Sequence, residues 1–394
     1  MTGQVKQRIS SIDVVRGIII IIMTLDHVRD FLHIHAADEN PLSVNPPNTL
    51  IFFTRWITHY CAPTFVFLAG ISAWLAGRKR TKNELSLFLI KRGVWLILVD
   101  VVLISFGFSL NPLYNMLILE VLWAIGASMI ILGLLVRTSM VVITTAGLII
   151  FLGHNLLDYT QLPANGWGVS VRVLISGAAT VIPLGGGYNL LVLYAPVTWA
   201  GILLLGYSIG RLYDDARFTM QKRQKALYLL GSTVVLLFII LRWINKYGDP
   251  TPWAEQKDAF ATFLSFINTS KYPPSLLFSC MTLGPLLILL AVAERIKGKF
   301  ASFTMVYGRA PLFYFVVHLY LIRIINLAAF FATGHTWAEK ADPAMLFLFR
   351  PQHFGFNIWV IYLLWLLVVL LMYYPCKWFN GYRATRNYWW LRYT

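Results

Sequence analysis

Charged residues are scarce in this 394-residue sequence. Asp, Glu, Lys and Arg make up only 13% of the residues, about half of the roughly 25% that soluble domains carry. Hydrophobic residues make up 58%, and the mean hydropathy is +0.66. This composition excludes a soluble enzyme with a single anchor and predicts a polytopic membrane protein.

Signals for metal and nucleotide chemistry are also missing. The chain has three cysteines, Cys61, Cys280 and Cys376, and their spacing does not match a metal site. It contains no zinc signature and no nucleotide-binding fingerprint. We therefore expect core thiols, no metal and no permanently bound cofactor.

Long apolar runs are abundant, and they predict ten transmembrane helices in a single membrane domain over residues 1–394. No polar stretch is long enough to fold as a second domain. The expected fold is an all-α bundle, with an eleventh membrane segment if a re-entrant helix forms near 169–184. The ten predicted spans lie near 11–30, 50–76, 87–109, 113–136, 139–157, 190–210, 226–243, 275–293, 303–331 and 355–375.

Positive charge is concentrated in alternate connections between these spans. The net charge is +16, and Lys and Arg cluster at both termini and in connections such as 77–92 and 211–225. By the positive-inside rule, both termini are predicted to be cytoplasmic. The pattern explains the basic character without a nucleic-acid partner, and we expect a lipid bilayer as the surroundings. Lys271, in an outer connection, is expected to be an interfacial lysine that snorkels.

The first span carries ionisable residues at both ends. Asp13 and Arg16 lie at its start, and His27 and Asp30 lie near its end. Arg16 and His27 are close to three helical turns apart, so they share a face and are separated by about 16 Å along the axis. Asp30, one turn beyond His27, is placed to accept the imidazole proton and fix its tautomer.

Other polar residues fall at a similar predicted depth. His59, Glu120 and His318 each lie about 10 to 14 Å below the outer boundary, and Asp100 lies near the middle of its span. Ionisable groups inside a membrane are costly, so each needs a partner or a function. Two interpretations stay open: the groups pair within the bundle, or they carry proton chemistry in catalysis or in a transport relay.

Five segments of the chain carry a family resemblance. They read "SIDVVRGIIIIIMTLDHVRD", "RWITHYCAPTFVFLAGISAWL", "LYAPVTWAGILLLGYSIGR", "NTSKYPPSLLFSCMTLGP" and "YGRAPLFYFVVHLYLI". In this order they resemble the bacterial branch of the heparan-α-glucosaminide N-acetyltransferase family. The spacing Arg16-x10-His27 is also similar to the Arg-x10-His signature in the first helix of the acyltransferase-3 family.

The resemblance implies acyl transfer from a cytoplasmic acyl-CoA to a sugar or glycan, in a bacterial cytoplasmic (inner) membrane. Carried over residue by residue, it makes His27 the catalytic base and Arg16 a residue of the donor side. Arg309, at the cytoplasmic start of its span, is a further candidate for binding the coenzyme A phosphates. His59 or His318 would donate to the developing oxyanion or carry the acyl group.

The loop after the first span offers a second location for the base. In the animal enzyme of this family an asparagine matches His27, and the catalytic histidine lies in the following loop. Here that loop contains His33 and His35, with Asp38 at the ungapped position. The sequence leaves open which histidine is essential, and it favours His27.

We therefore expect a membrane acyltransferase that moves an acyl group, with acetyl the expected one, from acyl-CoA to a hydroxyl or amine of a carbohydrate. The alternative is a proton-coupled transporter or lipid-linked sugar flippase, which would neither bind acyl-CoA tightly nor cleave it. A non-catalytic scaffold for envelope assembly is a third interpretation. The acceptor, the acyl chain length and a homodimeric assembly stay open.

Overall fold

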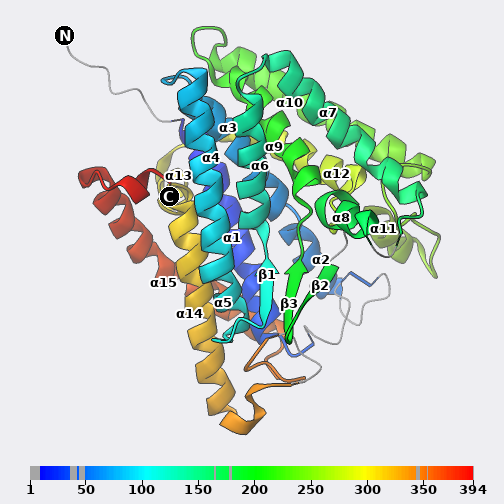
Figure 1. Cartoon of the computed structure of the whole chain (residues 1–394), viewed down its shortest axis with the longest axis vertical. Coiled ribbons are helices and arrows are strands. Elements are labelled where there is room, and N and C mark those ends of the chain that lie inside the picture. The colour runs from blue at the N-terminus through cyan, green and yellow to red at the C-terminus, as the bar shows by residue number, and fades with distance from the viewer. Residues whose placement is uncertain are drawn as a thin grey trace.

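The chain forms a helical bundle around its first helix (Figure 1). The computed structural model describes residues 9–35, 42–43, 49–163, 166–176, 180–342, 347–352 and 354–393. Helix α1 (Ser10–Leu32) runs through the middle of the bundle and is buried along most of its length. It contacts helices from both the beginning and the end of the chain. The centre of the bundle is therefore assembled from segments that are far apart in sequence.

Within the described residues, six helical segments are long and apolar enough to cross a membrane. They are α2 and α3 (Thr49–Thr58 and Cys61–Gly77, counted as one), α7 (Met140–Gly153) with a 3-10 extension to Tyr159, α10 (Met220–Ile244), α12 (Leu276–Ala293), α14 (Pro311–Ala332) and α15 (Ile358–Thr385). Helix α4 (Lys82–Val99) is also long, and a π-helical turn (Asp100–Ile104) joins it to α5 (Ser105–Ser109). The helical membrane fold is confirmed, while the count of ten spans and the orientation of the termini stay predictions.

Helix α1 packs most closely against α13 (Gly298–Gly308). A Cβ atom at Gly308 would clash with the Asp13 carbonyl group, and one at Gly17 would clash with the Thr304 carbonyl group. Only glycine allows the two backbones to approach this far. The contact fixes the start of α1 against the end of α13, beside Arg16 and Arg309.

Two predicted spans, 113–136 and 190–210, prove to be a strand followed by a helix. The observed elements are β1 (Met116–Leu119) with α6 (Val121–Leu135), and β3 (Tyr188–Val192) with α9 (Pro196–Ile209). β1 and β3 pair in parallel, with Leu117 opposite Leu190. Backbone groups at membrane depth need partners, and these short strands obtain them from each other. Apolar content alone did not distinguish such strands from helix.

The segment near 169–184, predicted as a re-entrant helix, is helical only in its first part. Helix α8 (Trp167–Val171) continues as a π-helical turn to Ser176, and residues 177–179 lie outside the described chain. The segment then forms β2 (Thr180–Gly185), which pairs antiparallel with β3 and completes a sheet of order β1-β3-β2.

The span predicted at 303–331 is broken into α13 and α14. Pro311 begins α14, and the preceding Ala310 has left the helical region, with φ −125° and ψ 51°. The proline ring clashes with the residue before it and disfavours the α conformation there, which explains the break. The junction places Arg309 between two helices and beside α1.

The C-terminal segment returns to α4 (Figure 1). After α15, a 3-10 turn (Trp389–Arg392) places Trp389 in edge contact with Trp95, at 5.8 Å between ring centroids. Tyr393 stacks on Phe88 at 6.0 Å. The end of the chain thereby lies at the same end of the bundle as the start of α1. The remaining outer helix, α11 (Ala259–Ile267), lies in the connection between α10 and α12.

Candidate active site

Two histidines that are far apart in sequence meet in the middle of the bundle. His27 of α1 and His318 of α14 are joined by a 2.8 Å hydrogen bond between His27 Nδ1 and His318 Nε2. Their rings stack with centroids 5.0 Å apart. His318 is fully buried, whereas His27 is partly exposed. Phe108 and Phe315 contact the His27 ring edge-on and form apolar walls around it.

The hydrogen bonds of this pair determine where its protons lie. His318 Nδ1 is 2.7 Å from the carbonyl oxygen of Tyr314, which can only accept, so Nδ1 carries the proton. With both imidazoles neutral, His318 Nε2 is then an acceptor and His27 Nδ1–H donates to it. His27 Nε2 is left with its lone pair, the form that a general base requires.

A cavity opens toward this pair from the end of the bundle where α1 begins, and we call it the N-side cavity. It has a volume of about 230 Å³, and four arginines and mostly apolar side chains line it. The arginines are Arg16, Arg92, Arg309 and Arg383. They come from α1, α4, the junction before α14, and α15, so four separate elements supply positive charge to one cavity.

Most of these arginines are held in place by hydrogen bonds. Arg16 donates to Ser72 Oγ at 2.9 Å, to the Gly308 carbonyl at 3.1 Å and to Asp13 at 3.3 Å. Arg383 donates to the carbonyl of Arg309 at 2.6 Å, and Arg309 lies 3.6 Å from the Asp13 carboxylate. In Arg92, the Nε atom is buried without a hydrogen-bond partner in the described chain. The carboxylate of Asp13 is thus shared by Arg16 and Arg309, and the described lining of the cavity contains no aspartate or glutamate.

The inner end of the N-side cavity lies next to His27. Its lining includes Met23, one helical turn before His27, and Phe315, whose ring contacts the His27 ring at 5.9 Å between centroids. A long molecule with an anionic end could therefore place its other end beside the histidine pair. The predicted donor-side residues Arg16 and Arg309 do come together here. Arg92 was noted only as part of a basic connection, and Arg383 only as part of a basic tail.

Asp30 does not contact His27. Its carboxylate accepts a hydrogen bond from Arg29 at 2.6 Å, and the Nδ1 position that it was expected to bind is occupied by His318. Helical spacing correctly placed Asp30 one turn away, but it did not reveal the closer partner on a distant helix. Asp26 instead forms the main ion pair of this region, with both oxygens 2.7 Å from Arg55 Nη1.

His59 belongs to a second cavity, at the end of the bundle where α1 ends. This C-side cavity measures about 330 Å³, and its basic lining residues are Arg55, His59, Arg242 and Lys271. His59 is 1% exposed, packs edge-on against Phe278 at 5.2 Å, and has a buried Nδ1 without a hydrogen-bond partner in the described chain. The predicted layer of three histidines is therefore a pair plus one residue in a separate cavity.

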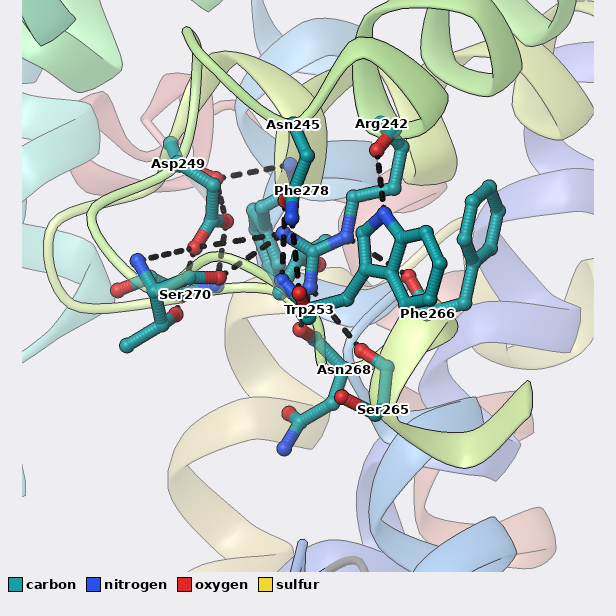
Figure 2. Close-up of polar contacts among 12 residues, drawn as sticks. Arg242, Asn245, Asp249, Trp253, Ser265, Phe266, Asn268, Ser270 and Phe278 are labelled. Atoms are coloured by element: carbon teal, nitrogen blue, oxygen red, sulfur yellow. Dashed lines mark hydrogen bonds and ion pairs between the residues drawn. The ribbon is translucent and has the colours of Figure 1, made fainter. Parts of the chain in front are cut away.

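Arg242 fixes one wall of the C-side cavity (Figure 2). Its guanidinium donates to the carbonyl groups of Thr251, Ser265, Phe266 and Asn268 at 2.7 to 3.0 Å. Trp253 closes the network by donating its indole N–H to the Arg242 carbonyl at 2.7 Å. The four carbonyl groups that Arg242 binds belong to the connection between α10 and α12. Because this connection has little regular secondary structure, its backbone carbonyl groups need other hydrogen-bond donors, and Arg242 supplies them.

The loop histidines lie apart from the His27 pair. His33 ends α1 and is buried against the segment around Phe356. Burial lowers the pKa of His33 to about 4, and the nearby Arg29, His35 and Arg350 add to the effect. A group with such a pKa is a weak base at neutral pH. Asp38, which occupies the ungapped position of the animal enzyme's loop histidine, lies outside the described residues.

Asp100 and Ser208 each form a hydrogen bond that stabilises the fold. Asp100 accepts a 2.7 Å hydrogen bond from the backbone N–H of Glu120 and so caps the start of α6. Ser208 lies in a Gly-x-Ser-x-Gly pattern at 206–210, but this stretch belongs to α9 and the 3-10 turn after it. Its hydroxyl bonds the Leu204 carbonyl at 3.0 Å, so no strand-to-helix nucleophile elbow is formed.

A family model matches the part of the chain that contains most of these residues. The family model described as "Heparan-alpha-glucosaminide N-acetyltransferase, catalytic" matches residues 8–242. The chain belongs to this family. The matched segment contains Arg16, His27, His59 and Arg92, whereas His318 lies beyond it. No curated protein matches the chain.

Membership of this acetyltransferase family, together with the six apolar helices, makes the chain an integral membrane protein with a transferase domain. The resemblance stated from the sequence is confirmed at the level of the family. Both cavities also contain residues from beyond the matched segment. Arg309 and Arg383 line the N-side cavity, Lys271 lines the C-side cavity, and all three follow residue 242.

Proposed function

We propose that the protein transfers an acetyl group from cytoplasmic acetyl-CoA, bound in the N-side cavity, to a hydroxyl or amine of a carbohydrate that enters from the opposite side. The observation that carries the proposal is a cavity lined both by four arginines and by Met23 and Phe315, of which Phe315 contacts the ring of His27. Family membership supports the reaction type. The predicted positive-inside orientation puts this cavity on the cytoplasmic side, where acyl-CoA is found.

The N-side cavity matches the chemistry of coenzyme A. Its arginines suit phosphate groups, which form strong charge-assisted hydrogen bonds with guanidinium. The apolar walls beyond them suit the thin pantetheine arm, because few polar groups there compete for its contacts. A donor held in this way presents its thioester near Met23 and Phe315, and therefore near His27.

His27 is the proposed general base. Its free Nε2 takes the proton from the acceptor hydroxyl or amine as the acceptor atom attacks the thioester carbonyl carbon. The new C–O or C–N bond forms, the C–S bond breaks, and the departing thiolate recovers the proton from the His27 imidazolium. His318 acts on this step through His27, since it fixes the tautomer and accepts the Nδ1 proton in a hydrogen bond.

The test is consumption of the thioester by the purified protein. Wild type supplied with acetyl-CoA and a mixture of sugars is expected to release free CoA, and His27→Ala is expected to lose about 10²- to 10⁴-fold of that rate, the usual contribution of a general base. Binding of acetyl-CoA by His27→Ala should persist, because no arginine of the N-side cavity is changed. Absence of acetyl-CoA binding and cleavage in wild type would contradict the proposal and favour the transporter interpretation.

A further inference from the structure

The C-side cavity contains a buried lysine that forms no ion pair or hydrogen bond with any described residue. Lys271 is 9% exposed and lines the cavity. Its ammonium lies 5.0 Å from the ring centroid of Tyr272, and no described residue gives it a hydrogen bond or ion pair. The sequence suggested a snorkelling interfacial lysine, but the structure buries this side chain against a cavity instead.

The other cations of the cavity already have partners. Arg55 is paired with Asp26, and Arg242 is held by four backbone carbonyls and lies 3.9 Å from Asp249. Among the described lining residues there is no aspartate or glutamate. Glu120 and Asp26 lie within electrostatic range of Lys271, but neither lines the cavity or bonds to the lysine. The positive charge of Lys271 is therefore directed into the cavity.

His59 adds a second unused polar group on the same wall. Its ring is buried, and its Nδ1 has no hydrogen-bond partner in the described chain. A buried imidazole without a partner costs about 1 to 3 kcal/mol. Because His59 also lines the cavity, a ligand there is a candidate for the missing partner. Lys271 and His59 come from the α10–α12 connection and from the break between α2 and α3, so two separate segments converge here.

We propose that the C-side cavity is an oxyanion-binding subsite, in which Lys271 and His59 bind a carboxylate or a phosphate group carried by the acceptor sugar. One part of this inference, that the ligand is the acceptor sugar, rests on the proposed function. The binding chemistry is independent of it, because an ammonium and an imidazole N–H recognise an oxyanion whether or not the sugar is later acetylated. The polar lining around them, including Asn268, Ser270 and Thr251, suits the hydroxyl groups of a sugar ring.

The experiment measures equilibrium binding by titration calorimetry to the full-length protein in detergent, without acetyl-CoA. The probes are glucuronate, glucose 6-phosphate and glucose, which share a ring and differ in the charged group. Binding is measured in wild type and in His27→Ala, so failure of the acyl-transfer proposal would not affect the result. At least one acidic sugar should bind roughly tenfold or more tightly than glucose, as expected for one charge-assisted hydrogen bond. The sugar that does so identifies a carboxylate or a phosphate as the group recognised.

The matched variants are Lys271→Gln and Lys257→Gln. Both remove one lysine charge from the α10–α12 connection, but Lys257 is exposed and lines neither cavity. Lys271→Gln should lower affinity for the acidic sugar roughly tenfold or more, while Lys257→Gln and the charge-retaining Lys271→Arg should stay close to wild type. A size-exclusion profile and a melting temperature close to those of wild type show that Lys271→Gln is folded, and His59→Phe serves as a second variant if it is not.

Two results would overturn the proposal. One is equal affinity of wild type for all three sugars, or no detectable binding of either acidic sugar. The other is unchanged affinity for the acidic sugar in both Lys271→Gln and His59→Phe.

Discussion

The N-side and C-side cavities are both cationic, but their cations are arranged differently. In the N-side cavity, four arginines stand at one end of a mostly apolar space that leads to His27. In the C-side cavity, most lining residues are polar. Arg55 and Arg242 bind other groups of the protein, whereas Lys271 has no ion pair with any described residue. The first arrangement suits a long molecule with an anionic head, and the second suits a small polar group with an anionic substituent.

The His27–His318 pair lies next to the inner end of the N-side cavity, and changing it gives the largest expected effect on turnover. His318→Phe removes the acceptor for His27 Nδ1–H, so the tautomer of His27 is no longer fixed. We expect kcat to fall roughly 100-fold or more, by analogy with the loss of orienting groups in other histidine bases, with little change in acetyl-CoA affinity. His318→Gln, which can both donate and accept, should recover part of the rate. Equal rates for His318→Phe and wild type would exclude the proposed role.

The difference between the cavities predicts that their ligands respond to different substitutions. Arg383→Gln should weaken acetyl-CoA binding about tenfold, because one charge-assisted contact to phosphate is lost, and it should leave acidic-sugar binding unchanged. Lys271→Gln should show the reverse pattern. Arg386→Gln is the matched control, since Arg386 is exposed three residues further along and does not line the cavity. Calorimetry with both ligands on all three variants checks this, and a parallel loss for both ligands would show that the cavities are not separate sites.

The smallest expected effect is that of Asp30. Asp30→Asn should change kcat by no more than about twofold, the range of ordinary surface substitutions, because its carboxylate bonds Arg29 and not His27. If Asp30 oriented the base, the same change would cost the roughly 100-fold expected for His318→Phe. A steady-state rate measurement on the two variants side by side therefore decides which residue orients His27.

The sequence predicted those features that depend on neighbours along one helix. The membrane character, most helical spans, and the placement of Arg16 and His27 at two ends of one helix all follow from apolar runs and helical spacing. The placement of Arg16 and Arg309 at one end of the bundle also follows from the positions of the basic connections, and both residues line the N-side cavity.

The features that depend on tertiary contacts could not be predicted in the same way. His318 is 291 residues from His27, so no local spacing could show that it, and not Asp30, would occupy Nδ1. The strands at 116–119 and 188–192 are as apolar as helices and are specified by pairing with each other. Lys271 was assigned to the interface because its sequence neighbours are polar, whereas the folded connection buries it.

The central claim is that the donor lies in the N-side cavity with its thioester beside His27. The most direct test is an experimental structure of the protein with a non-hydrolysable acetyl-CoA analogue. We predict phosphate density at Arg16, Arg92, Arg309 and Arg383, with the acetyl carbonyl carbon within roughly 6 Å of His27 Nε2, since one acceptor atom must fit between them. An analogue bound outside the N-side cavity, or bound there with its acetyl group directed away from His27, would contradict the account.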